Sequence, residues 1–168
     1  MSGDEKNPFY TPASERDALE SHLDIERNAL IKKIEGLDDA TARKAPTASS
    51  LSLLALVKHC AAWERRWFQV AVAGREFPDE WPAVEEPEDA TMAVGENDTV
   101  EHWVAYYREQ IEQSRAIAAS LDLDSPGARP DLIDCNLRYV MVHMIIETAR
   151  HAGHADIIRE TLDGSTGL

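Results

Sequence analysis

Four long segments of this chain repeat apolar residues at intervals of three and four, and this pattern constrains the fold more than any other feature. They span about residues 14–37, 50–73, 98–121 and 137–162. Apolar side chains at such intervals line one face of an α-helix, and no segment shows the two-residue alternation of a β-strand. Proline, glycine or short polar clusters separate the segments, as is typical of helix ends. The sequence therefore predicts an all-α fold, a four-helix bundle.

Particular residues mark the ends of these predicted helices. Ser14 can cap the first helix, and Asp17, three residues later, takes the place of the glutamate in a capping box. Asp98 or Thr99 can cap the third helix, and Gly164 lies where the fourth helix should end. These signals place helix boundaries independently of the apolar pattern.

The connection between the second and third predicted helices, residues 75–97, is long for a compact domain. It contains Pro78, Pro82 and Pro87 together with many acidic residues, so it cannot be one continuous helix. We expect this crossover to run from one end of the bundle to the other or to lie over a functional site.

The composition argues against several classes of protein. The 168 residues include 17 Lys and Arg against 31 Asp and Glu, which gives a net charge of −14. Such a charge repels the phosphates of nucleic acids, and the chain has no apolar run of the ~20 residues that span a membrane. Its first residues are polar, unlike a signal peptide, and its two cysteines do not make a disulfide framework. We therefore expect a cytoplasmic protein that binds neither nucleic acids nor membranes.

The length predicts a single domain over residues 1–168, because one domain usually takes about 150 residues. Hydrophobic residues make up 43% of the chain and charged residues 29%, as in ordinary globular proteins. We expect roughly the first 13 residues and the last few to be tails outside the bundle.

Polar residues interrupt the apolar faces of the second and fourth predicted helices. His59 lies between Leu56 and Trp63 on the apolar face of the second helix. Glu147 and His151 are four residues apart, so they lie one turn apart on the same face of the fourth helix. Side chains at this spacing can hold one metal ion, and His59 could supply a third ligand from across the core. Two imidazoles and a carboxylate suit Zn²⁺, Ni²⁺ or Fe²⁺ and leave coordination positions for water or substrate.

A metal-free interpretation of the same residues is also open, because a histidine on an apolar face is often a core residue with satisfied hydrogen bonds. Glu147 would then form an ordinary salt bridge with His143, Arg150 or His151. His154, one turn beyond His151, could be a fourth ligand, a partner that orients His151, or a proton carrier. The orienting role is favoured, since ligating side chains usually have such a partner.

The cysteines and the aromatic residues of the second helix favour plainer interpretations. Cys60 follows His59 directly and is expected to be a small buried residue rather than a nucleophile. Cys135 falls in a predicted loop, and no role is assigned to it. Trp63, Trp67 and Phe68 are expected to pack in the core rather than to form a binding platform.

Residues 30–37, 52–68 and 147–160 carry a resemblance to a known family. The first of these stretches ends the first predicted helix, and the other two contain the candidate ligands. With these stretches the chain resembles the DinB/YfiT-like superfamily of metalloenzymes over about residues 14–164. Members of that superfamily are four-helix bundles, so the resemblance implies the same fold as the apolar pattern.

The resemblance also implies which residues hold a metal. In this superfamily the ligands are one histidine of the second helix and two residues four apart on the fourth, which match His59, Glu147 and His151. The pair on the fourth helix is commonly two histidines, and a glutamate at the first position is similar to the mycothiol-dependent branch, which includes a maleylpyruvate isomerase. Family members often have glutamine where this chain has His154, which implies a role near the metal rather than as a ligand.

The leading functional hypothesis from this resemblance is a metal-dependent thiol S-transferase. A divalent transition metal would keep a low-molecular-weight thiol, such as mycothiol or bacillithiol, as a thiolate that attacks an electrophilic small molecule. A metal-dependent hydrolase is the nearest enzymatic alternative. The alternatives without catalysis are a metal-binding or stress-related interaction bundle and a bundle that holds no metal. Family members often pair, so the resemblance also leaves a homodimer open.

Overall fold

The structure is a computed structural model, and it describes residues 14–77 and 88–166. The expected N-terminal tail and the last two residues lie outside the described residues, as does the middle of the long connection, residues 78–87.

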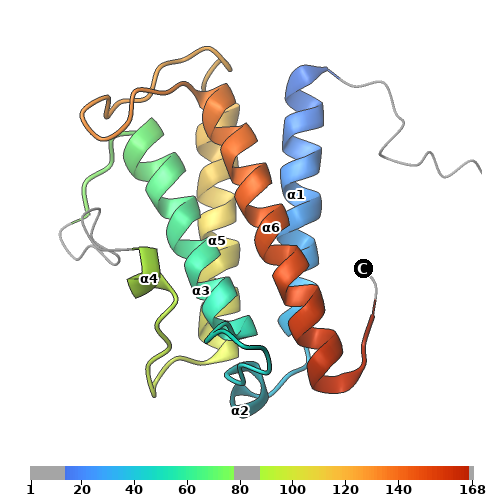
Figure 1. Ribbon diagram of the computed structural model, residues 1–168. Helices are drawn as coiled ribbons and strands as arrows, with labels where there is room; N and C mark the ends of the chain where they lie inside the picture. Colours follow the sequence, from blue (N-terminus) through green and yellow to red (C-terminus); the bar gives the residue numbers. More distant parts are fainter. Residues whose placement is uncertain (1–13, 78–87, 167–168) are drawn as a thin grey trace, which may run out of the picture.

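Four long helices run side by side and form the bundle that the sequence predicts (Figure 1). They are α1 (Glu15–Ile34), α3 (Leu53–Glu64) with its continuation η2 (Arg65–Val72), α5 (Val100–Ala119) and α6 (Leu137–Asp163). Two short helices lie in the connections, α2 (Asp39–Ala42) and α4 (Glu88–Thr91). Within the described residues, β pairing is limited to an isolated bridge between Pro126 and Asn136. The all-α fold class is therefore confirmed.

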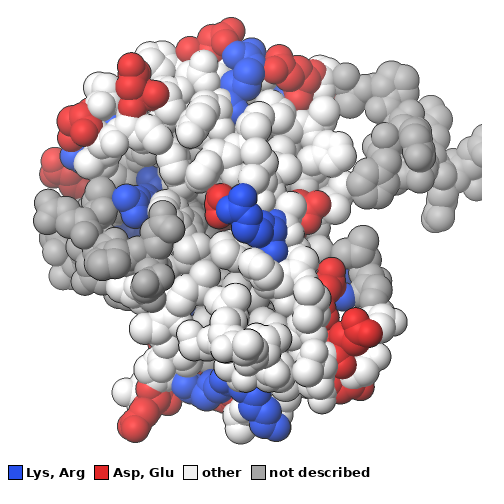
Figure 2. Space-filling model, in the orientation of Figure 1, with Lys and Arg blue, Asp and Glu red and all other residues white. Residues whose placement is uncertain are grey.

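The face of the molecule over α6 carries few charged side chains (Figure 2). Charged groups of both signs gather near the middle of this face, and more of them lie around its rim. Among the helices of the described part of the chain, none combines the length and the apolar character needed to cross a membrane.

The helix ends follow the residues that mark them in the sequence. Ser14 Oγ accepts a hydrogen bond from the backbone N–H of Asp17 at 3.1 Å, and the Asp17 carboxylate accepts one from the backbone N–H of Ser14 at 3.3 Å. This reciprocal pair is the predicted capping box. Thr99, rather than Asp98, caps α5. Gly164 ends α6 with a φ of +78°, a left-handed conformation that glycine adopts without a steric penalty.

The second long helix changes from an α-helix to a π-helix at Arg65, which the apolar spacing did not predict. Ser52 caps the start of α3, where its Oγ accepts a hydrogen bond from the backbone N–H of Ala55. In a π-helix the hydrogen bonds reach one residue further than in an α-helix, so successive side chains turn by a smaller angle. Each residue from Trp67 to Val72 is buried in this segment.

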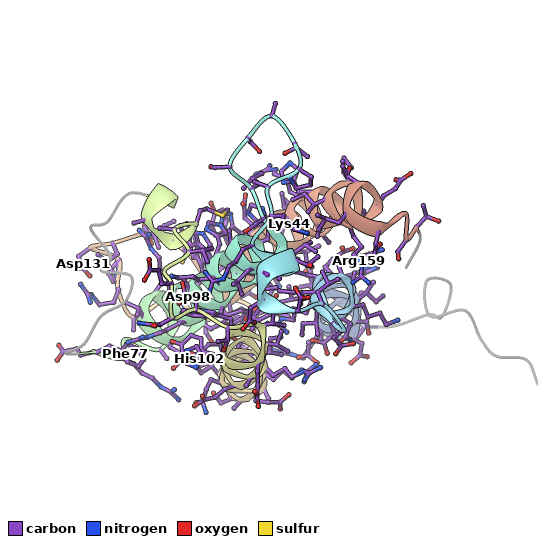
Figure 3. The ribbon with its side chains drawn as sticks, turned by 90° about the horizontal axis from the view of Figure 1, so that it is seen from below. Lys44, Phe77, Asp98, His102, Asp131 and Arg159 are labelled. Carbon is purple, nitrogen blue, oxygen red and sulfur yellow. The ribbon has the colours of Figure 1, made fainter. Side chains whose placement is uncertain are left out.

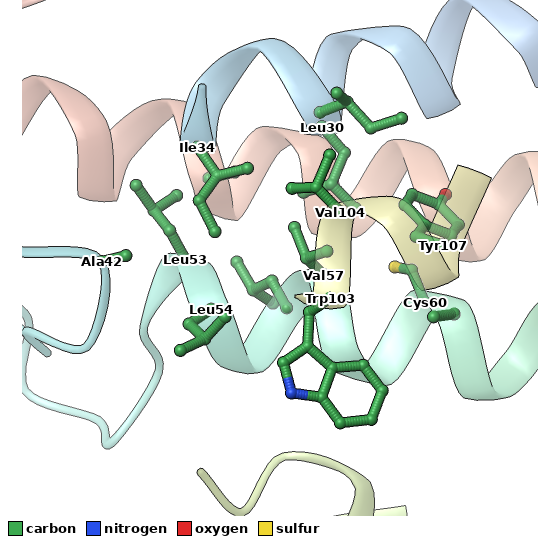
Figure 4. Packing of buried hydrophobic residues seen from close by; sticks show 14 of the residues in the cluster. Leu30, Ile34, Ala42, Leu53, Leu54, Val57, Cys60, Trp103, Val104 and Tyr107 are labelled. Atoms are coloured by element: carbon green, nitrogen blue, oxygen red, sulfur yellow. The ribbon is translucent and has the colours of Figure 1, made fainter. Parts of the chain in front are cut away.

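The core lies between all four long helices, with α1 packed mainly on α6 and α3 mainly on α5. Figure 3 looks along the bundle from below and shows Phe77 and Arg159 on opposite sides of it. Figure 4 shows part of the core, where fully buried side chains of three helices meet. Among them are Leu30 of α1, Val57 of α3 and Tyr107 of α5. Burying an aliphatic side chain of this kind stabilises the fold by about 1.5–3 kcal/mol.

A buried ion pair joins α1 to α3 inside the bundle. The Arg27 guanidinium donates two hydrogen bonds to the two carboxylate oxygens of Glu64, each at 2.7 Å. Both side chains are almost completely buried, and Arg27 also donates to Asp24 at 2.9 Å. The Glu64 carboxylate is the charge that makes a buried arginine tolerable at this position.

The described part of the long connection lies beside the second long helix. The short helix α4 contacts α3, and Thr91 at its end is buried against His59. The expectation that this crossover lies over a candidate site therefore holds for its described part.

Candidate functional site

His59 of α3 and His151 of α6 lie in contact inside the bundle. Their ring centroids are 4.7 Å apart, and the two ring planes meet at 75°. His59 is only 4% exposed and His151 only 8%. Two histidines that are far apart in the sequence are thus brought together by the packing of α3 on α6.

Glu147 lies one turn before His151 at the edge of this pair. Its Oε2 is 3.8 Å from His151 Nε2, and its Oε1 accepts a hydrogen bond from Arg150 Nη1 at 2.8 Å. The side chain of Glu147 is 26% exposed, so its carboxylate lies at the boundary between the buried histidines and solvent. Of the salt-bridge partners considered from the sequence, Arg150 is therefore the closest.

Two side chains hold the Nδ1 atom of His59. Trp63 Nε1 donates a hydrogen bond to it at 3.1 Å, and the Thr91 hydroxyl forms a second, shorter contact with it. The Thr91 hydroxyl can donate or accept, depending on which ring nitrogen carries the proton. These contacts fix the ring of His59 from the side of Nδ1.

Burial keeps both histidines neutral near neutral pH. It lowers the pKa of His59 to about 3, and the nearby His151 adds to this shift. Burial also lowers the pKa of His151, although the carboxylate of Glu147 acts in the opposite direction. Neutral imidazoles are the form that binds metal ions.

The donor set fits a transition metal in its chemistry, although the present side-chain arrangement does not form a complete site. His151 Nδ1 is buried and has no hydrogen-bond partner among the described residues, which leaves its bonding capacity unused. Within residues 14–77 and 88–166, no three His, Cys, Asp or Glu side chains are grouped as metal ligands. One oxygen of the Glu147 carboxylate accepts from Arg150, and the other lies 3.8 Å from His151 Nε2.

His154 lies beyond His151 on α6. The two ring centroids are 5.9 Å apart, and His154 Nδ1 is buried without a hydrogen-bond partner among the described residues. His154 does not line the cavity in front of the two histidines. It is thus a neighbour of His151 outside the lining of that cavity.

A cavity of about 300 Å³ opens in front of His59 and His151. Its lining comes from the second long helix, the connection after it and α6, and consists of His59, Trp63, Trp67, Met92, His143, Glu147, Arg150 and His151. Trp63 and Trp67 are stacked with 6.2 Å between ring centroids and 25° between ring planes. The expectation that the tryptophans serve only as core packing is incomplete, because both line this cavity while Phe68 is buried in the core.

Sequence reasoning missed several residues around this cavity. Trp63 was placed on the face of His59, and the same four-residue spacing extends to Trp67, but both were expected to pack in the core rather than to line a cavity. Thr91 and Met92 had no such signal, because they belong to a connection without regular periodicity.

Neither cysteine is placed to act in this cavity. Cys60 is buried in the core behind His59, and burial raises the pKa of its thiol well above the usual value. Cys135 is partly buried next to α6, and burial also raises its pKa. Both thiols are free.

Comparison with known proteins gives a family match and a structural neighbour. Residues 18–164 match the family model described as Mycothiol-S-transferase. A solved structure titled "conserved protein of locus" from Enterococcus faecalis superposes with a TM-score of 0.62 at 14% identity. The superposition covers 92% of this chain and 100% of that one, so it supports the fold. No curated protein matches the chain at a significant level.

Proposed function

Because this chain belongs to the mycothiol-S-transferase family, we propose that it transfers a low-molecular-weight thiol such as mycothiol to an electrophilic small molecule. We further propose that His59, Glu147 and His151 hold a divalent transition metal for this reaction. The observation that carries the proposal is the contact between His59 and His151 at the inner end of an aromatic-lined cavity, with Glu147 beside them.

Such a metal, when bound, supplies positive charge that keeps a thiol sulfur deprotonated near neutral pH. In the transfer, the thiol loses its proton and its sulfur forms a bond to an electrophilic carbon. The leaving group departs from that carbon with the bonding electron pair. The two histidines, which burial keeps neutral, are in the form that can bind such a metal.

The chain's own residues have distinct parts in this proposal. For His59 to bind the metal through Nε2, its Nδ1 would have to carry the proton and donate to Thr91 Oγ1, and Trp63 would have to release its hydrogen bond to Nδ1. Trp63, Trp67 and Met92 form walls that exclude water and pack on the apolar part of the electrophile. His154, partly buried next to His151, would steady that ring or accept a proton.

Elemental analysis of untagged protein is the first test. We expect close to one transition metal per chain in the parent protein, and its loss in the His59→Ala and Glu147→Ala variants. A parent protein without metal, even after incubation with Zn²⁺ and Ni²⁺, would overturn the metal site. The tag has to be absent because polyhistidine binds these ions itself.

A thiol-transfer assay then tests the reaction. Mycothiol and other low-molecular-weight thiols would be offered with 1-chloro-2,4-dinitrobenzene, which loses chloride as the sulfur–carbon bond forms. We expect turnover that is lost in His151→Ala together with the metal. Transfer that persists after complete removal of the metal would contradict the proposed mechanism, and a metal-loaded protein without transfer activity would favour a binding role.

A further inference from the structure

Glu147 and Arg150 are the carboxylate and the guanidinium of the cavity lining, and they are paired with each other. Arg150 Nη1 lies 2.8 Å from Glu147 Oε1, and its side chain is 57% exposed, so it is at the outer rim. Figure 2 shows charged side chains of both signs near the middle of the face over α6, within a largely uncharged surround. In this arrangement the charges of the pair cancel at the entrance.

A metal at the proposed site would end this cancellation. A carboxylate that binds a divalent ion through either oxygen gives its negative charge to that ion, so its attraction for a neighbouring guanidinium falls. Glu147 would then neutralise the metal rather than Arg150. The guanidinium of Arg150 at the rim would then no longer be neutralised by Glu147. It would lie next to a site that itself has excess positive charge.

The walls of the cavity suit a flat group beside this guanidinium. The stacked rings of Trp63 and Trp67 form one wall, and the ring of His143 lies 4.4 Å from that of Trp67 by their centroids. The Arg66 guanidinium, which does not line the cavity, lies over Trp63, 4.7 Å from its ring centroid. A planar, conjugated molecule can pack against this aromatic lining while an anionic substituent reaches Arg150.

We infer that the cavity selects flat electrophiles that carry a carboxylate, which pairs with Arg150 once the charge of Glu147 is taken up by the metal. This inference rests on the proposed function and adds the substrate class to it. The net charge of −14 opposes anions at long range, but such repulsion is screened beyond about 8 Å at physiological salt. The guanidinium in direct contact with the ligand therefore decides the preference.

The exchange of partners can be tested without any metal. The probes are 3,5-dinitrobenzoate and its neutral analogue 3,5-dinitrobenzamide, which have the same ring and no leaving group. Calorimetric titration of metal-free Glu147→Gln should show dinitrobenzoate binding about three- to tenfold tighter than to metal-free parent protein, because Arg150 has lost its internal partner. The affinity for dinitrobenzamide should stay the same.

Two further variants decide whether Arg150 is responsible. Adding Arg150→Gln to Glu147→Gln should return the affinity for dinitrobenzoate to that of the parent protein. Glu112→Gln is the matched control, because Glu112 and Arg115 form a pair with the same three-residue spacing on α5, away from this cavity. It should change neither affinity. Unchanged dinitrobenzoate binding in Glu147→Gln, or tight binding that survives in the double variant, would overturn the inference.

Addition of Zn²⁺ distinguishes a failure of this inference from a failure of the proposed metal site. If both hold, Zn²⁺ should increase the dinitrobenzoate preference of the parent protein but increase it less in Arg150→Gln. If Glu147→Gln gains the preference while the parent protein binds no Zn²⁺, the metal site is wrong and the anion site at Arg150 stands.

Discussion

At the scale of single residues, the buried imidazole of His59 makes the stability of the metal-free protein depend on pH. Its pKa of about 3 in the folded state lies below the ~6.5 of an unfolded histidine, so the unfolded chain takes up the proton first as the pH falls. The contribution is fully present above about pH 6.5 and decreases by about 1.4 kcal/mol per pH unit toward pH 3. Urea unfolding between about pH 7 and 4.5 measures this loss.

The control for this pH dependence is His59→Gln, because the protonation of other groups also lowers the unfolding free energy in acid. Removing the histidine should make the decrease in unfolding free energy shallower by the share that His59 contributes. Identical slopes in the two proteins would show that the pKa of His59 is not lowered by burial.

A second residue-scale prediction concerns the hydroxyl that faces His59. Thr91→Val removes one of the two partners of His59 Nδ1, the one that can accept its proton, while keeping the shape of the side chain. We expect metal affinity to fall by about 10- to 100-fold, as is usual when a ligand loses its orienting partner. Competition with a chelator of known affinity measures this. Thr161→Val, which removes an exposed hydroxyl that bonds Ile157 O on α6, should leave the affinity unchanged.

The sequence predicts some of these residues and not others for physical reasons. The four-residue spacing of Glu147 and His151 fixes their shared face, because an α-helix has 3.6 residues per turn. The position of His59 on an apolar face indicates the core but not which helix it meets. The hydroxyl of Thr91 reaches His59 only through the path of an irregular connection, and no periodicity encodes that path.

At the scale of helices, capping signals predicted boundaries well because they are local. The capping box at Ser14 and the left-handed Gly164 depend only on the neighbouring backbone, so sequence spacing suffices to find them. The π-helix from Arg65 to Val72 is different, because its apolar residues could also line an ordinary α-helix. The apolar spacing therefore does not distinguish the two kinds of helix.

The buried ion pair between α1 and α3 gives a prediction at this scale. Glu64→Gln removes one charge and leaves the Arg27 guanidinium buried with only Asp24 as a charged partner. We expect a loss of about 3–5 kcal/mol in unfolding free energy, as for other broken buried pairs. Urea unfolding measures it.

The matched variant replaces both members of the pair. Arg27→Met with Glu64→Gln removes both charges and should be less destabilised than Glu64→Gln alone, because no unpaired charge is then buried. A double variant that is less stable by the sum of the two single losses would mean that Arg27 and Glu64 act independently.

At the scale of the whole molecule, a metal at the candidate site would join the two halves of the bundle. His59 belongs to α3, which packs mainly on α5, and His151 belongs to α6, which packs mainly on α1. A ligand that binds only the folded state at about 100 times its Kd adds about 2.7 kcal/mol to the unfolding free energy. For a chain of 168 residues, this corresponds to a rise in Tm of roughly 5–10 °C.

The Tm measured with Zn²⁺ and with excess chelator therefore shows whether a metal at this site stabilises the whole fold. The parent protein should show the rise in Tm with Zn²⁺, and His151→Gln should not. The Tm of His151→Gln with chelator serves as its own baseline. Glu112→Gln changes a charged pair on α5 outside the site and should respond to Zn²⁺ as the parent does. If His151→Gln gained as much from Zn²⁺ as the parent protein, the ion would be bound elsewhere, and α3 and α6 would not be joined through His59 and His151.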